Sequence, residues 1–362
     1  MSEAESLRFT GVNTVRWRRR ELIYFSGCDY FRLARDARVA AAARTALVRH
    51  GLNVAASRMT TGNHTIYREL ETALAEFFDA ESALVLPDGY LAPMAVAQVL
   101  AGEFSHVLMD ELAHGALVDA AKFMRCPVKK FRHRDAEDLA RAARACELPI
   151  VFTDGMFAHD GSVAPLREYL RCLPADAQIL VDDAHGAGVL GRNGRGTLEH
   201  AGVGRARVIQ CATLSKAFGA YGGVVVGTRE LREKIVSGSR IFMGTTPLPP
   251  PLAGAAIAAI RILSGSQGAR QREKLFANTR RLRERLEIPG WEIAKTPGPI
   301  VRLPLKLTSV AAERMRKHFI EMGFYPPFLK YGNFPPAIRY VVSSRHPEAQ
   351  LDRLAVITGF PK

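Results

Sequence analysis

The stretch from Gln178 to Gly223 constrains the fold of this chain more than any other. An aliphatic run, Ile179-Leu180-Val181, ends abruptly in the carboxylates of Asp182 and Asp183, and His185 follows. A short run of this kind suits a strand that is buried on both faces of a parallel sheet. Because open α/β sheets place their ligands at the carboxyl ends of such strands, the sequence predicts a functional site here.

A second apolar run, from Val208 to Cys211, leads into two hydroxyls and an amine, Thr213, Ser215 and Lys216. One sheet edge would then carry an acid, an imidazole, hydroxyls and a lysine. Pyridoxal phosphate needs that set, since it has a basic ring nitrogen, a phenolic oxygen, an aldehyde and a phosphate. Each residue alone also has a structural explanation, because paired aspartates often form turns and a lysine in a glycine-rich loop is usually solvated.

Strands alternate with helices from Ser82 onward, which predicts an α/β fold whose mostly parallel sheet is covered by helices on both faces. Besides the two runs above, strands are expected at 21–25, 83–86, 106–109, 128–131, 150–153 and 223–227, and near Ile300 and Ile338. Helices are expected at 39–48, 65–78, 136–146, 252–263, 269–286, 310–322 and 346–356, and after the strands at 83–86 and 106–109.

The chain is expected to divide into four segments. Residues 1–35 form an irregular lead-in, 36–250 a large cofactor-binding domain, 251–287 linking helices, and 288–362 a small C-terminal α+β domain. The boundary near 250 follows from the run Thr-Thr-Pro-Leu-Pro-Pro-Pro, which cannot form the interior of a regular helix.

Three residues have predicted roles around the cofactor ring. Lys216 is the predicted Schiff-base lysine, whose freed amine is placed to take a proton from the substrate Cα. Asp182 is expected to face the ring nitrogen and keep it protonated. His185 is expected to donate to the phenolic oxygen. Asp183 is the weaker candidate, because adjacent strand residues point to opposite faces of a sheet.

Further positions extend the predicted site. His114 is expected to stack on the cofactor ring, with helix capping as the alternative. Gly89 and Tyr90 precede a helix whose N-terminal N–H groups would hold the phosphate. Thr213 is expected to add a hydroxyl and Thr245 another, the latter from the same chain or from a second subunit.

Arg339 lies in the largely apolar run Pro-Pro-Ala-Ile-Arg-Tyr-Val-Val. A buried arginine is costly unless it is paired, and a carboxylate ligand would pair it in a bidentate manner. Arg339 is therefore predicted to bind a substrate carboxylate, with a structural salt bridge as the alternative.

Composition narrows the possible partners. The 362 residues carry a formal net charge of +14, and an excess of this size attracts anions. Without zinc-finger spacing or an aromatic–basic platform, a phosphorylated substrate or an acidic carrier is favoured over nucleic acid, and a solvated basic surface is the alternative. Scattered cysteines, a polar N-terminus and short apolar runs predict a cytoplasmic protein with no metal centre and no transmembrane segment.

These motifs resemble the α-oxoamine synthase family of fold-type I pyridoxal-phosphate enzymes, which includes 8-amino-7-oxononanoate synthase-like proteins. The resemblance runs from about Tyr24 to Leu354, and it is most specific in the runs 181–191, 213–219 and 245–250. It implies a homodimer with active sites at the interface. It also assigns the cofactor to Lys216, Asp182, His185, His114, Gly89, Tyr90, Thr213 and Thr245, and the amino acid carboxylate to Arg339.

The resemblance further implies a reaction. An amino acid condenses with an acyl thioester of coenzyme A or acyl carrier protein, carbon dioxide is lost, and an α-amino ketone forms. A pyridoxal-phosphate lyase, aldolase or aminotransferase on the same fold is the alternative, and a non-catalytic protein that keeps the fold is a third interpretation.

The sequence departs from the family pattern at positions that face the substrate, which predicts a specialised amino acid or acyl chain. The departures are Ala113 and Gly115 beside His114, Ala158 in place of a serine, His159 in place of a methionine, Lys330 where some relatives carry an arginine, and the runs 27–33 and 53–58.

Overall fold

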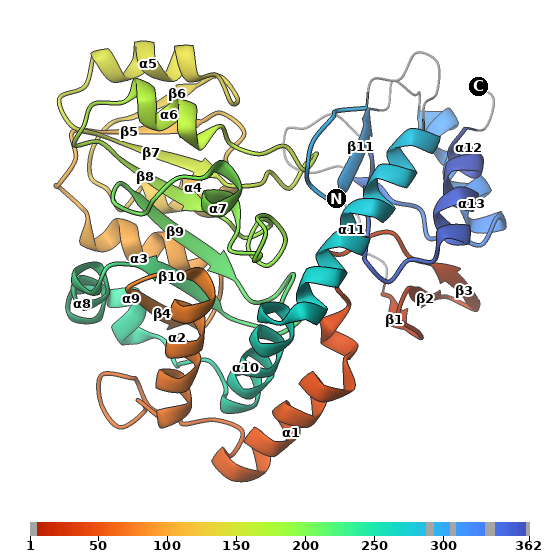
Figure 1. Ribbon diagram of the computed structural model, residues 1–362, viewed down its shortest axis with the longest axis horizontal. Helices are drawn as coiled ribbons and strands as arrows, with labels where there is room; N and C mark the ends of the chain where they lie inside the picture. Colours follow the sequence, from red (N-terminus) through yellow and green to blue (C-terminus); the bar gives the residue numbers. More distant parts are fainter. Residues whose placement is uncertain (1–5, 287–292, 305–308, 330–336, 360–362) are drawn as a thin grey trace. The chain divides into compact units, whose positions relative to one another are not determined.

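The computed structural model describes residues 6–286, 293–304, 309–329 and 337–359, which form two compact units (Figure 1). The larger unit contains Leu33–Ala158 and Val163–Ala269. The smaller unit contains the described residues up to Arg32, the segment His159–Ser162, and the described residues from Arg270 onward. Residues 251–269, predicted as part of the linking helices, thus belong to the larger unit, and the lead-in shares a unit with the C-terminal residues.

A seven-stranded sheet forms the centre of the larger unit, in the order β4-β10-β9-β8-β7-β5-β6. Its strands are β4 (Ser82–Leu86), β5 (His106–Asp110), β6 (Val128–Phe131), β7 (Pro149–Asp154), β8 (Gln178–Asp182), β9 (Val208–Thr213) and β10 (Gly223–Gly227). Strand β10 runs antiparallel to both of its neighbours, and the pairs from β9 to β6 are parallel. The predicted mostly parallel sheet is therefore confirmed.

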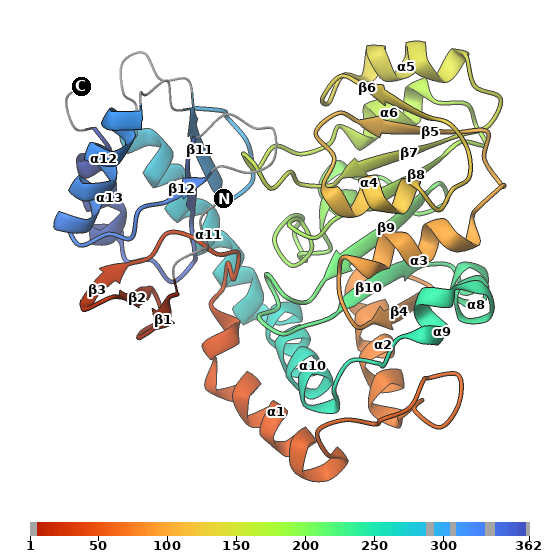
Figure 2. The ribbon, with the colours of Figure 1, turned by 180° about the vertical axis from the view of Figure 1, so that it is seen from behind.

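Helices cover both faces of this sheet (Figures 1 and 2). The helices of the larger unit are α1 (Ala37–His50), α2 (Thr65–Phe78), α3 (Leu91–Val99), α4 (Gly115–Ala121), α5 (Ala136–Arg144), α6 (Leu166–Cys172), α7 (Thr197–Ala201), α8 (Arg229–Gly238), α9 (Arg240–Gly244) and α10 (Pro250–Ser264), with a 3-10 turn at Leu33–Arg35; α1 packs on α10. Leu180 of β8 packs into the core formed with α3, α4 and α8, whereas Ile179 and Val181 pack into the core formed with α5 and α6. Strand β8 is thus buried on both faces, as its sequence predicts.

The strand register brings three strand ends together. Asp154 at the end of β7 lies opposite Asp182 at the end of β8, and Asp182 lies opposite Cys211 of β9. Because side chains alternate along a strand, Asp154 and Asp182 share the face of Phe152 and Leu180, which is the face covered by α3 and α4. Thr213 shares this face, since it lies two residues beyond Cys211.

The smaller unit contains two three-stranded sheets. The antiparallel sheet β1 (Arg8–Phe9), β2 (Thr14–Trp17) and β3 (Arg20–Ile23) lies in the segment predicted to be irregular apart from one strand, so that prediction is wrong. Alternation explains the sheet, because Val15 and Trp17 point inward while Arg16 is exposed. The other elements are α11 (Ser266–Arg285), which begins in the larger unit, β11 (Ile300–Pro304), α12 (Ser309–Glu321), β12 (Phe328–Leu329), β13 (Ala337–Val341) and α13 (Glu348–Thr358).

The proline run lies at the start of α10 and not wholly before it. The helix begins at Pro250 rather than at Leu252, because proline is tolerated in the first turn of a helix, where its missing N–H has no intrahelical partner. Among the described residues, no helix combines the length and the apolar character that crossing a membrane requires.

Candidate active site

The predicted lysine and histidine meet beyond the ends of β8 and β9. The Nζ atom of Lys216 lies 2.9 Å from Nε2 of His185, which is a hydrogen-bonding distance. His185 is buried and Lys216 is half-buried. A lysine in this position is held by an imidazole rather than by bulk water, which contradicts the alternative of a fully solvated loop lysine.

Asp182 ends β8 three residues before His185, and its charge and that of Lys216 both act on His114 and Asp154. Its side chain is buried, and its Oδ1 accepts a hydrogen bond from the N–H of Ala184 at 3.1 Å. A buried carboxylate is costly unless a cation or hydrogen-bond donors compensate it. Asp182 therefore offers a compensating charge to a cationic ligand group at this sheet edge.

His114 makes the helix cap that the sequence left as the alternative to ring stacking, and it lies near Asp182 and Lys216. It is the N-cap of α4, and its Nδ1 accepts a hydrogen bond from the N–H of Ala116 at 3.2 Å. Burial lowers the pKa of His114, and the nearby Lys216 lowers it further while Asp182 raises it. An acceptor at Nδ1 and a lowered pKa favour a neutral ring with its proton on Nε2. Capping fixes the orientation of the ring, so it is compatible with stacking on a ligand.

Asp154 is a residue that the sequence reasoning missed. Its Oδ2 accepts a hydrogen bond from the backbone N–H of His114 at 2.8 Å, and the side chain is buried. Burial and the neighbouring charge of Asp182 raise the pKa of Asp154 well above its usual value. The pattern of an apolar strand ending in aspartate, present at both 150–154 and 179–182, is the signal that could have identified it.

Asp154 is therefore expected to act as a neutral positioning group for His114. Asp154→Asn keeps an acceptor oxygen, so its kcat/KM should stay within about threefold of wild type. Asp154→Ala removes a hydrogen bond worth about 1.5 kcal/mol, so kcat/KM should fall about tenfold. Steady-state kinetics across a pH series compare the two variants. Equal losses in both would show that the negative charge, and not the acceptor, is required.

The adjacent Asp183 has a structural role. Its carboxylate accepts hydrogen bonds from the hydroxyl of Thr197 at 2.6 Å, the N–H of Thr197 at 2.8 Å and Nε2 of Gln210 at 2.6 Å. Burial raises its pKa to about 6. A methyl group at Gly186 or Gly196 would lie within 2.0 Å of this carboxylate. Asp183 thus fixes the glycine-rich loop after β8. This structural role agrees with the expectation that Asp183 and Asp182 point to opposite faces of the sheet.

The predicted phosphate-binding residues surround the start of α3. A Cβ at Gly89 would lie 2.7 Å from Cβ and 2.8 Å from Oγ1 of Thr213, so only glycine lets that hydroxyl approach the turn before α3. The Thr213 hydroxyl also bonds the Ser215 hydroxyl at 3.2 Å. These contacts make a small polar cradle on the same sheet face as Asp182.

Tyr90 makes different contacts from those predicted for a phosphate ligand. Its backbone N–H donates to Oδ1 of Asp88 at 2.7 Å, and its hydroxyl donates to Asp119 at 2.5 Å. The rings of Tyr90 and His114 meet edge to face with centroids 6.1 Å apart. The Tyr90 ring therefore packs against His114 and supports its position. A phosphate that bound the backbone N–H of Tyr90 would have to displace the carboxylate of Asp88.

Thr245 and Arg339 belong to different units. The Thr245 hydroxyl donates to the carbonyl of Ile241 at 2.8 Å and so ends helix α9. Arg339, in the smaller unit, is half-buried rather than fully buried, and its Nη2 lies 3.7 Å from Sγ of Cys28. Arg302 of β11 lies opposite Arg339 in register, so the two arginines share one face of the sheet. Lys330 lies outside the described residues.

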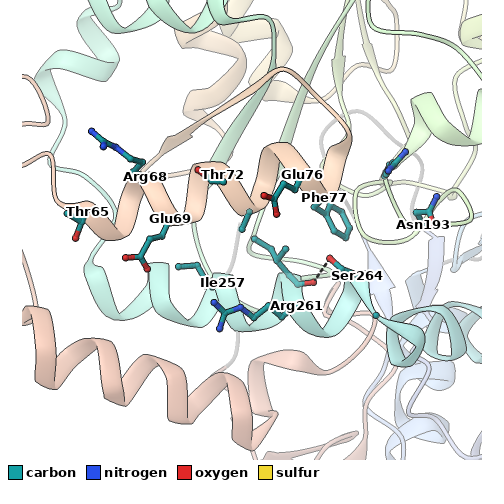
Figure 3. Close-up of a pocket in the computed structure, with 14 residues that line it drawn as sticks. Thr65, Arg68, Glu69, Thr72, Glu76, Phe77, Asn193, Ile257, Arg261 and Ser264 are labelled. Carbon is teal, nitrogen blue, oxygen red and sulfur yellow. Dashed lines mark hydrogen bonds between the residues drawn. The ribbon is translucent and has the colours of Figure 1, made fainter.

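A large pocket in the larger unit does not coincide with this site. It has a volume of about 1070 Å³ and lies between α2 and α10, where Thr65, Glu69, Ile257 and Arg261 line it (Figure 3). None of the predicted site residues is among those that line it. The chemistry of the cluster around Lys216, and not pocket size, therefore identifies the candidate active site.

The residues present fit pyridoxal phosphate. The amine of Lys216 suits its aldehyde, the buried carboxylate of Asp182 suits a cationic ring nitrogen, and His185 can donate to its phenolic oxygen. The cradle at Gly89 and Thr213 can accommodate the phosphate, and His114 presents a fixed neutral ring.

The family model for aminotransferase class I and II matches residues 21–357 of the chain. The chain belongs to the aminotransferase class I and II family. Two curated relatives are both 8-amino-7-oxononanoate synthases. The protein from Thioalkalivibrio sulfidiphilus is 36% identical over 343 residues, covering 92% of this chain and 87% of that protein. The protein from Thermoanaerobacter pseudethanolicus is 35% identical over 351 residues, covering 95% and 88%.

Solved structures of two serine palmitoyltransferases are similar to this chain. A structure of serine palmitoyltransferase from S. paucimobilis, with a bound adduct of pyridoxal phosphate and myriocin, has a TM-score of 0.91 at 26% identity and covers 98% of this chain and 91% of that chain. Serine palmitoyltransferase from Sphingomonas wittichii has a TM-score of 0.90 at 28% identity, covering 96% and 89%. The predicted fold-type I architecture and α-oxoamine synthase resemblance are confirmed.

Proposed function

We propose that this chain is a pyridoxal-phosphate-dependent acyltransferase that condenses an amino acid with an acyl thioester and releases carbon dioxide and an α-amino ketone. The contact of 2.9 Å between Lys216 Nζ and His185 Nε2, beside the buried Asp182, carries the proposal. Its relatives named 8-amino-7-oxononanoate synthase and serine palmitoyltransferase support this reaction class over others of the family.

Pyridoxal phosphate, when bound, supplies an aldehyde that forms imines with amines and a cationic ring that accepts electrons. Asp182 keeps a proton at the ring nitrogen through charge attraction. His185 donates at the phenolic oxygen and steers the Lys216 amine. Lys216 takes the proton from the substrate Cα and later returns one. His114, fixed by its cap and by Asp154, limits movement of the ring and the access of water.

Arg339 is the proposed anchor for the amino acid carboxylate. Its removal should raise the KM for the amino acid by about thirtyfold or more, since a charge-assisted hydrogen-bond pair is worth about 2 kcal/mol or more. The affinity for the cofactor should change little. Arg302 shares the same sheet face, so Arg302→Ala is the matched comparison. A larger KM increase in Arg302→Ala would transfer the role to that residue.

We also propose a homodimer, to which Thr245 contributes from the partner subunit. Exposed apolar side chains support an interface at the end of α1 and the loop after it, where Val48 is 83% exposed and Leu52 is 70% exposed. Light scattering should give about twice the chain mass of 39.7 kDa. A mass equal to one chain would contradict the dimer.

Cytoplasmic location stays a prediction from the sequence.

A matrix of amino acids against acyl thioesters, read by mass spectrometry, tests the proposed function. Product whose mass equals both substrates minus the carrier thiol and carbon dioxide is the expected result. Keto acid formation without thiol release would support the aminotransferase alternative. Thiol release without loss of carbon dioxide would contradict the decarboxylating reaction.

A further inference from the structure

A basic groove lies in the smaller unit, beside the turn of the β2–β3 hairpin and helix α12. Its volume is about 520 Å³, and it is lined by Trp17, Ile320, Glu321 and four cations, Arg18, Arg19, Arg20 and Lys317. The side chains that line the groove therefore carry four positive charges and one negative charge, a net charge of +3. None of the proposed cofactor residues lines this groove.

The local fold keeps these cations around an apolar floor. Trp17 pairs with Arg20 across the hairpin, so Arg18 and Arg19 form the turn, with Arg18 in the left-handed region at a φ of 53°. Trp17 packs inward with Val15, Leu22 and Ile320. The guanidinium of Arg18 lies 4.4 Å from the ring centroid of Trp17, a cation–π geometry that limits its movement.

The shape and charge favour an acidic protein over other anionic partners. Trp17 is only 8% exposed, so it can neither insert into a bilayer nor stack on a nucleic-acid base. A concave surface with an apolar floor and a charged rim suits a protruding helix with an apolar ridge. Clustered arginines raise the rate at which an acidic partner associates and orient it on approach.

We propose that this groove docks an acidic helix of the acyl carrier protein that delivers the thioester. The inference rests on the proposed function, because only a thioester-using enzyme requires an acyl carrier. Acidic side chains of the helix would face Arg19, Arg20 and Lys317, and an apolar side chain would meet Ile320. The chain would thus take its acyl group from a protein carrier in preference to free coenzyme A.

The test compares one acyl group on two donors, a bacterial holo-acyl carrier protein and coenzyme A. The variant Arg19→Glu/Arg20→Glu/Lys317→Glu reverses three exposed cations of the groove. Its matched control, Lys130→Glu/Arg144→Glu/Arg171→Glu, makes the same charge change at exposed positions of the larger unit. The groove variant should raise the KM for the carrier-protein donor about tenfold or more at low salt, because rim charges act on association, and leave kcat and the KM for the coenzyme A donor unchanged. The control should change neither.

Equal KM changes for both donors, or none in the groove variant, would overturn the docking surface. Fluorescence anisotropy with labelled holo-acyl carrier protein measures docking without turnover, so it separates this inference from the reaction itself. The groove variant should weaken this binding about tenfold, and unchanged binding would reject the proposal even if the enzyme proves inactive. Tighter binding of anionic phospholipid vesicles or single-stranded DNA than of the carrier protein would also reject it.

Discussion

Lys216→Ala should lose the visible absorbance of the lysine-bound cofactor and about four orders of magnitude or more in kcat. Losses of this size are typical when the covalent group of a catalytic unit is removed. The variant deletes both the amine that joins the cofactor and the base that takes the Cα proton. Absorbance spectra and single-turnover assays after addition of pyridoxal phosphate measure the two losses separately.

Lys130→Ala is the matched control, because Lys130 is an exposed lysine on β6, the edge strand of the same sheet. It should retain both absorbance and turnover. A Lys216→Ala enzyme that turns over at the wild-type rate would contradict the role given to Lys216.

Asp182→Asn should lower kcat about a thousandfold while the fold is kept. Charges about 4 Å apart attract by about 4 kcal/mol at an effective dielectric constant of about 20, which is about three pKa units. Without the carboxylate, the ring nitrogen is expected to lose its proton near neutral pH. The pH dependence of the cofactor spectrum and of kcat measures this loss, and Asp182→Glu should restore part of the activity.

Asp183→Asn gives the contrasting result, because Asp183 holds Thr197 and Gln210 on the other side of β8. The amide group of asparagine cannot accept all three donors, so the variant should lower Tm and leave the cofactor spectrum unchanged. If Asp183→Asn affects the spectrum more than Asp182→Asn does, the assignment of the two carboxylates is reversed.

The strand ends of the larger unit were predictable because their sequence carries two signals at once. The run ending at Asp182 is apolar enough to be buried on both faces, and its abrupt change to carboxylates marks the sheet edge. The predicted neighbours Lys216 and His185 do lie together, since parallel strands bring their carboxyl ends to one edge.

Other features depend on tertiary context that a single sequence does not display. Asp154 lies opposite Asp182 because β7 pairs with β8 in that register. The sequence of neither strand reveals which strand lies next to it in the sheet. The β2–β3 hairpin has a short alternating pattern, and its inward residues pack against Ile320 of α12 and Tyr325, which lie far along the chain. The direction of β10 likewise follows from pairing with β4 and β9 and not from its apolar composition.

Borohydride reduction followed by peptide mass mapping tests the central assignment most directly. The protein is incubated with pyridoxal phosphate, reduced and digested, which converts an imine at a lysine into a stable phosphopyridoxyl group. The modification is expected at a single residue, Lys216, and it should be lost in Lys216→Ala. Modification at another lysine, or none at all, would contradict the assignment of Lys216 as the cofactor-binding residue.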